Sequence, residues 1–252
     1  MSNTQQIFQS PDDMPAEVAS AVLHWILSVA DTKHRIGFQF SRWVTGTPAL
    51  EAAVGAAAIT QDELGHARSL YALLKDYPGA PDGVGAENDL QARDLYYVPH
   101  ALTPDWESWL HVVAVMTLLD HALQIAIMQM DGSAYKPLAG RVAKMVQEEK
   151  FHRIFGKSWV ERLVQRDDNT KEKLQTSIDW AWRLTDAWIG PADEAVTTQL
   201  VAAGVLKGDA TTIRQQWLDA VSPLLTDNGL TRPDDIVDWS GWDSQFRAIS
   251  SR

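Results

Sequence analysis

Two copies of a glutamate–histidine motif are the residues of this sequence best suited to chemistry. Glu63 and His66 lie in "DELGHA", and Glu149 and His152 lie 86 residues later in "EEKFHR". Residues three apart share one face of an α-helix, so each pair can reach one metal ion together. In some helical bundles, two such motifs and one carboxylate from each of the other two helices form a two-metal site. The two motifs therefore predict a dinuclear metal site.

A third expected metal ligand is Asp120, the only acidic residue between Glu107 and Asp131. It lies in the apolar run "VMTLLDHALQI", where an unpaired carboxylate would be costly. Metal coordination would remove that cost, and so would pairing with a neighbouring arginine or tryptophan. Because Asp120 lies on a different helix from both motifs, we favour metal coordination.

The remaining ligand is expected from "ADTKHRIGFQF", in the first helical segment. Asp31 and His34 share a helical face, and His34 precedes Glu63 by the same 29 residues that separate Asp120 from Glu149. We favour Asp31 as the ligand, because a carboxylate can bridge two metal ions, with His34 as the alternative. Lys33 offers a different outcome, an ion pair with Glu63 that would weaken the metal site.

This set of ligands favours iron or manganese, because it combines carboxylate and imidazole groups without thiolate. The chain has no cysteine. Two such ions close together suit O₂ activation or the oxidation of Fe(II). The other histidines are expected to be packing or surface residues; they are His24, His100, His111 and His121.

Helical patterns dominate the segments that must position these ligands. Thr47-Pro48 and Thr103-Pro104 are typical of helix starts, and we identify no strand. The four segments expected to form long helices are residues 15–44, 47–76, 104–130 and 137–165, and three further helices follow. A short, a long and a second short connection are typical of a ferritin-like bundle. The predicted fold is an all-α, ferritin-like four-helix bundle with additional C-terminal helices.

The composition excludes several classes of partner. A formal net charge of −11 without a Lys/Arg cluster argues against nucleic acid and anionic membranes. The most apolar segment, 109–130, contains Asp120 and two histidines, so we expect a buried helix, not a membrane span. The absence of cysteine and of a signal-peptide pattern fits a cytoplasmic protein. We expect a helical domain over 15–225, a flexible lead over 1–14 and a tail over 226–252.

The chain resembles the phenylacetic acid catabolic proteins, ferritin-like subunits of the phenylacetyl-CoA epoxidase, over roughly residues 20–225. The resemblance is strongest in "SRWVTGTPALEAAVGAAAITQDELGHARSLY", "LLDHALQIAI", "VQEEKFHRIFGKSWVERL" and "WAWRLTDAWI". That family contains both a catalytic protein with a di-iron centre and a structural paralogue that has lost its metal site. The pattern of "GKSWVERL" followed by "WAWRLTDAW" resembles the structural paralogue.

The ligands resemble those of the catalytic paralogue instead. Glu63, His66, Asp120, Glu149 and His152 match its metal ligands, whereas its first-helix glutamate falls near Lys33 or His34. The resemblance implies two iron ions, with Glu63 and Glu149 bridging or chelating them and the two histidines terminal. It also implies an external reductase as electron donor and an aromatic acyl-CoA as the small-molecule substrate.

Three functional hypotheses follow from these residues and this resemblance. The leading one is a di-iron, O₂-dependent monooxygenase component that oxygenates an aromatic or acyl-CoA substrate. The alternative is a non-catalytic scaffold subunit with a vestigial metal site, and the third is a ferritin-like ferroxidase or oxidase. In each case we expect a homo-oligomer or a hetero-oligomer with a paralogous ferritin-like subunit.

Overall fold

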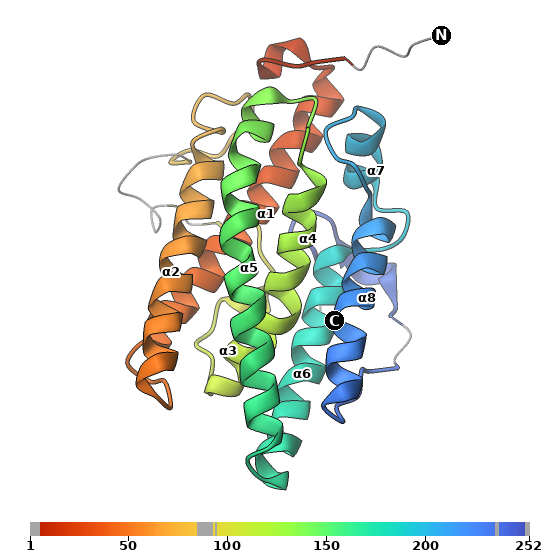
Figure 1. The fold of residues 1–252 in the computed structure, drawn as a ribbon. Coiled ribbons are helices and arrows are strands. Elements are labelled where there is room, and N and C mark those ends of the chain that lie inside the picture. The colour runs from red at the N-terminus through yellow and green to blue at the C-terminus, as the bar shows by residue number, and fades with distance from the viewer. Residues whose placement is uncertain (1–5, 85–92, 94, 235–236, 250–252) are drawn as a thin grey trace.

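The protein is a bundle of long helices, seen here in a computed structural model that describes residues 6–84, 93, 95–234 and 237–249 (Figure 1). The all-α class predicted from the sequence is confirmed. Two pairs of long helices surround the site. The first pair is α1 (Ala16–Trp43) and α2 (Leu50–Tyr71), and the second is the helix over Trp109–Gln129 and α5 (Lys136–Val164).

The starts predicted at residues 15 and 137 are confirmed to within a residue, whereas α2 begins at Leu50 and the third long helix at Trp109, after the predicted 47 and 104. α1 begins directly after Pro15, and α5 has a proline in its first turn, where the missing N–H costs no hydrogen bond. α2 ends at Tyr71, five residues before the predicted Asp76, and turns follow it. The long connection expected after this helix contains the short 3₁₀ helix η2 (His100–Leu102). Residues 85–92 and 94 of that prediction lie outside the described residues.

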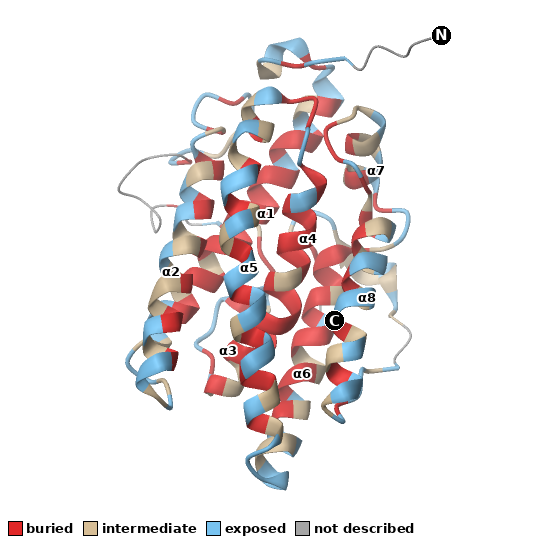
Figure 2. Cartoon of the chain, viewed as in Figure 1, coloured by how far each residue is buried: buried red, intermediate tan, exposed pale blue. Residues whose placement is uncertain are grey.

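The third long helix is not a regular α-helix throughout. It consists of α3 (Trp109–Val115), a π-helical turn η3 (Met116–Asp120) and α4 (His121–Gln129). It is long and apolar enough to cross a membrane, but 89% of its most apolar window is buried inside the protein (Figure 2). The helix is therefore part of the core, as its internal Asp120 predicts.

The later helices cover the third long helix and α1. They are α6 (Asp168–Ile189), α7 (Ala195–Ala202) and α8 (Ala210–Asp227). α6 packs against α3 and η3, α8 against α4, and α7 against α1. Asp167 and Asp209 begin α6 and α8 by accepting hydrogen bonds from backbone N–H groups, at 2.7 and 2.9 Å.

Short elements at both ends complete the described chain. The 3₁₀ helix η1 (Pro11–Asp13) precedes α1, and η4 (Trp239–Gly241) follows α8. Strands β1 (Trp242–Asp243) and β2 (Ala248–Ile249) form a two-residue antiparallel ladder. The sequence did not predict this ladder, because two residues are too short for an alternating pattern.

Candidate functional site

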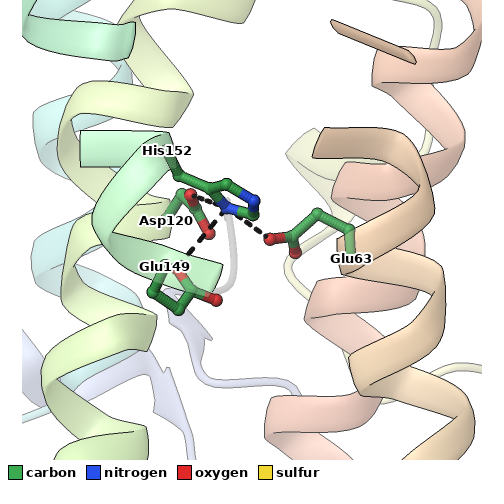
Figure 3. A group of neighbouring side chains, drawn as sticks. All are labelled: Glu63, Asp120, Glu149 and His152. Atoms are coloured by element: carbon green, nitrogen blue, oxygen red, sulfur yellow. Dashed lines mark hydrogen bonds and ion pairs between the residues drawn. The ribbon is translucent and has the colours of Figure 1, made fainter. Parts of the chain in front are cut away.

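Four predicted ligands meet at the centre of the bundle (Figure 3). Glu63 comes from α2, Asp120 from η3, and Glu149 and His152 from α5. Each offers one ligand atom, and these atoms all lie within 4.8 Å of one another. All four side chains are buried, so the group is closed to bulk water. Together with Lys33 and His66, described next, these residues are called the buried cluster.

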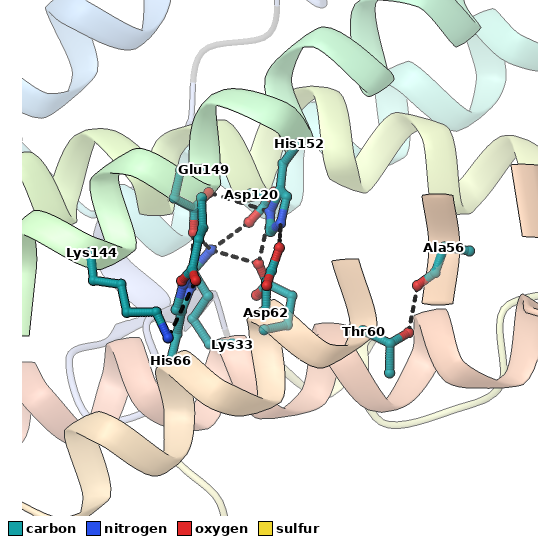
Figure 4. Close-up of polar contacts among 11 residues, drawn as sticks. Lys33, Ala56, Thr60, Asp62, His66, Asp120, Lys144, Glu149 and His152 are labelled. Carbon is teal, nitrogen blue, oxygen red and sulfur yellow. Dashed lines mark hydrogen bonds and ion pairs between the residues drawn. The ribbon is translucent and has the colours of Figure 1, made fainter. Parts of the chain in front are cut away.

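A lysine ammonium group occupies the middle of the buried cluster (Figure 4). Lys33 Nζ donates to Glu63 Oε1 at 2.9 Å, to Asp120 Oδ1 at 2.6 Å and to Glu149 Oε1. An ammonium group has three N–H donors, so all three are used on three carboxylates from three different elements. The lysine is fully buried, with 0% of its surface exposed. The ion pair with Glu63 that the sequence offered as an alternative is present, and it extends to two more carboxylates.

Two further carboxylates bind the histidines from the outer side of the buried cluster. His66 donates from Nε2 to Glu148 Oε2 at 2.8 Å, and His152 lies with Nε2 3.3 Å from Asp62 Oδ2. The pairing is crossed, because each histidine pairs with the acid that precedes the glutamate of the other motif. We call Asp62 and Glu148 the outer carboxylates.

The outer carboxylates were not among the ligands predicted from the sequence. The signal was present in "DELGH" and "EEKFH", where each Glu-x-x-His motif follows directly after a second acid. Their side chains are 29% and 27% exposed, so both lie between the buried cluster and solvent.

The opposite charges in the buried cluster stabilise one another. Burial by itself lowers the pKa of Lys33, but the charges of Asp120, Glu149 and Glu63 outweigh it and raise this pKa well above its usual value. Burial would raise the pKa of Glu149, but the charge of Lys33 and the neighbouring His152 and His66 hold it well below its usual range. Lys33 is therefore a cation and Glu149 an anion at neutral pH.

His152 is also a cation in this arrangement. Its Nδ1 lies 3.1 Å from Asp120 Oδ2, and its Nε2 faces Asp62. Ionised carboxylates only accept hydrogen bonds, so both ring nitrogens must carry a proton. In agreement, burial would lower the pKa of His152, but hydrogen bonds to Asp120 and Asp62 raise it well above its usual value.

The residues present do not fit a two-metal centre in this state. A metal ion needs an unprotonated imidazole nitrogen and free carboxylate oxygens. Here the His152 nitrogens point protons at carboxylates, and the Lys33 ammonium group uses one oxygen of each central carboxylate. Two divalent metal ions at the same place would repel that ammonium group.

The structure does not bring Asp31, the favoured first-helix ligand, to the buried cluster. Asp31 Oδ1 accepts hydrogen bonds from Tyr71 Oη at 2.6 Å and from Arg93, and Oδ2 accepts one from the Tyr97 backbone N–H at 2.7 Å. Both of its oxygens are thus used in an ion pair that joins α1 to the segment after α2. A helix turns 100° per residue, so Asp31 and Lys33 cannot point to the same neighbour.

His34, the alternative to Asp31, also lies outside the buried cluster. Its ring stacks on Tyr96, with centroids 5.2 Å apart and an interplanar angle of 17°. Neither ring nitrogen has a hydrogen-bond partner within the part of the chain that the structure describes. Burial and the charges of Arg35 and Arg93 lower the pKa of His34 to about 4, so the ring is neutral.

Two local features let the elements approach closely around the buried cluster. A Cβ on Gly37 of α1 would lie 2.9 Å from Cβ of Glu63, so only glycine allows α1 and α2 this close beside the site. In η3, the π-helical turn places Asp120 beside His152, and Trp217 of α8 donates to the Leu118 carbonyl at 3.1 Å. That hydrogen bond supports the irregular turn from outside.

The sequence of the chain is similar to known proteins of one family. A sequence profile of the family described as "Phenylacetic acid catabolic protein" matches residues 1–250. The chain is 23% identical over 197 residues to the A subunit of 1,2-phenylacetyl-CoA epoxidase from Escherichia coli (strain K12), a match that covers 76% of this chain and 62% of that relative. It is 27% identical over 197 residues to the C subunit of the same enzyme, covering 77% of this chain and 76% of that relative. The match thus spans less than two thirds of the A subunit.

Proposed function

Since the chain belongs to the phenylacetic acid catabolic protein family, we propose that it is a non-catalytic subunit of a complex of the phenylacetyl-CoA epoxidase type. A paralogous ferritin-like subunit would hold the metal centre. The observation that supports this most directly is the Lys33 ammonium group, bound to Glu63, Asp120 and Glu149 where a metal would have to coordinate. Two similar relatives are different subunits of one enzyme, which agrees with a pairing of paralogues.

The buried cluster then has a structural role. Four polypeptide segments meet at it, and a buried carboxylate needs a compensating positive charge. In a metal-binding relative, two ions would supply that charge; here Lys33 and His152 supply it. The bundle can therefore keep the shape required for pairing with a paralogue without binding a metal.

In this proposal the substrate and the electrons are used by the complex and not by this chain alone. An aromatic acyl-CoA would be oxygenated at the metal centre of the paralogous subunit, and a separate reductase would supply the electrons. The role of this chain is to bind and stabilise that paralogue.

Metal analysis together with reconstitution tests this function. The purified chain is loaded with Fe(II) without oxygen and desalted, and its iron content is measured. We expect well below one iron per chain. We also expect a stable complex with a metal-binding family member, whose oxygenation of phenylacetyl-CoA with a reductase requires this chain.

The di-iron monooxygenase remains the second candidate, because the ligand atoms of Glu63, Asp120, Glu149 and His152 lie within 4.8 Å of one another. It requires displacement of Lys33, with His66 as a further ligand. About two irons per chain, with substrate oxygenation by this chain and a reductase alone, would establish it. Rapid O₂-dependent oxidation of Fe(II) without substrate oxygenation would indicate the ferroxidase instead. Either result would overturn the non-catalytic role.

A further inference from the structure

We infer that Lys33 is an internal substitute for a divalent cation, and that the surrounding groups are arranged so that replacing Lys33 by alanine creates a binding site for one transition-metal ion. This inference rests on the proposed function, since it concerns why the chain holds no metal. It adds that one side chain, Lys33, accounts for the loss of metal binding, and that the chain retains the other ligands and the groups that support them.

The orientation of the histidines is the first observation behind this inference. His152 turns Nδ1 toward Glu63, at 3.1 Å, and toward Asp120, at 3.1 Å. His66 turns Nδ1 toward Glu149, at 3.2 Å. Each ring therefore presents the same nitrogen to the centre and the other nitrogen to an outer carboxylate. Metal-bound histidines commonly have this arrangement, in which a carboxylate fixes the ring from behind.

Unused acceptor atoms are the second observation. Among the residues that the structure describes, Glu63 Oε2, Glu149 Oε2 and His66 Nδ1 are buried and have no hydrogen-bond partner. Buried polar atoms are usually paired, and unpaired ones call for an explanation. A cation-binding arrangement that one ammonium group only partly satisfies explains these three, because Lys33 has three donors and uses all of them on other oxygens.

Space and charge are the third observation. Lys33 is fully buried, so its truncation to alanine opens a polar space lined by three carboxylates. The same truncation removes a positive charge that those carboxylates require. A divalent ion fills the space and restores the charge, and carboxylate with imidazole is a ligand set for Co²⁺, Mn²⁺, Fe²⁺ or Zn²⁺.

The test compares Co²⁺ binding by the wild-type chain and by Lys33→Ala. We expect the variant to bind about one Co²⁺ per chain, with visible absorption bands from the bound ion. At a free Co²⁺ concentration of about one hundred times Kd, its melting temperature should rise by roughly 5–10 °C. The wild-type chain should show neither change. A folded Lys33→Ala protein without Co²⁺ binding would overturn the inference and leave the proposed function intact.

Matched double variants test the ligands and the outer carboxylates. Adding His152→Ala to Lys33→Ala should abolish Co²⁺ binding. Adding Glu148→Gln should weaken it by roughly 10- to 100-fold, because His66 loses its supporting carboxylate. Adding Glu161→Gln, on an exposed part of α5, should leave the affinity unchanged. Equal affinities for the Glu148→Gln and Glu161→Gln double variants would contradict the role of the outer carboxylate.

Failure of the first variant to fold is also informative. If Lys33→Ala is unfolded alone but folds when Co²⁺ is added, the ion has replaced the ammonium group and the inference holds. If it stays unfolded, Lys33→Ser receives the same test, since serine leaves the space open and its hydroxyl group is polar. Two variants that remain unfolded with Co²⁺ present would overturn the inference, because the ion then does not substitute for Lys33.

Discussion

The Lys33 ammonium group contacts three carboxylates in a region closed to water. Such a group of buried charges adds little net stability as a whole, because each charge loses its hydration. Removal of one member is a different matter, since the others remain buried without compensation. The residue with the largest expected effect is Lys33, because its fully buried ammonium group donates a hydrogen bond to each of Glu63, Asp120 and Glu149.

Lys33→Met is therefore expected to lower the free energy of unfolding by about 3–5 kcal/mol, because methionine keeps much of the volume but not the charge. Urea denaturation at pH 7 measures this change. The control is Lys157→Met on α5, because the Lys157 side chain is 60% exposed and forms a 3.7 Å ion pair with Glu161. The stability of this variant should be nearly unchanged. A similar small effect for both variants would show that the Lys33 charge is not required.

Asp31 is expected to matter for stability and not for metal binding. Its truncation to alanine leaves Arg93, Tyr71 Oη and the Tyr97 backbone N–H without their acceptor. We expect Asp31→Ala to lower the free energy of unfolding by about 3 kcal/mol. The Co²⁺ bound per folded chain in the Lys33→Ala background should not change. Loss of bound Co²⁺ from that double variant would assign Asp31 to the metal site after all.

At the scale of elements, the π-helical turn η3 decides where Asp120 lies. Its irregular backbone is supported from α8 by the hydrogen bond from Trp217 Nε1 to the Leu118 carbonyl, 3.1 Å long. Trp217 is fully buried and packs on Trp182, with ring centroids 4.4 Å apart. The tryptophan-rich later helices thus act as part of the core beside the site.

Trp217→Phe is expected to destabilise the protein by about 1 kcal/mol more than Trp106→Phe, the net value of one hydrogen bond. Both tryptophans are buried, but within the described residues the Trp106 indole N–H has no hydrogen-bond partner. The difference between the variants therefore reports the hydrogen bond from Trp217 to the Leu118 carbonyl, which also accepts a hydrogen bond from the His121 backbone N–H. Equal stabilities in thermal or urea unfolding would show that η3 does not depend on this contact.

The long helices could be predicted from the sequence because apolar residues repeat at helical spacing. The Thr-Pro pairs located two helix starts only approximately, since α2 begins after Ala49 and α3 after Ser108. Spacing within one helix predicted that Glu149 and His152 lie together, and they do; His66 instead contacts Glu149, and Glu63 contacts His152. Spacing could not predict how α1 is rotated against α2, which decides whether Asp31 or Lys33 faces Glu63. The partner of Asp31 was equally out of reach, because Arg93 lies in a segment without a periodic pattern. The π-helical turn leaves no trace in composition.

At the scale of the whole molecule, stability depends on titrating groups that respond to pH in opposite directions. Burial lowers the pKa of His34 and of His121 to about 4. As the pH falls below about 6.5, the unfolded chain protonates these histidines first, so both lower the free energy of unfolding. Burial and the charge of Asp120 raise the pKa of Glu63 to about 7. As the pH falls over this range, Glu63 therefore raises the free energy of unfolding, because the folded protein protonates this carboxylate before the unfolded chain does.

His34→Gln separates one of these contributions from the rest. Between pH 7 and pH 5 the wild-type chain pays the cost of keeping His34 neutral, whereas glutamine does not titrate. The stability of the wild type relative to the variant should therefore fall by about 2 kcal/mol over this range, since one pKa unit corresponds to about 1.4 kcal/mol. Urea denaturation of both proteins at the two pH values measures the change, and the Glu63 contribution cancels in the difference. Parallel pH dependences would mean that His34 is protonated in the folded protein at pH 5, and that the ring stacked on Tyr96 is not kept neutral by burial.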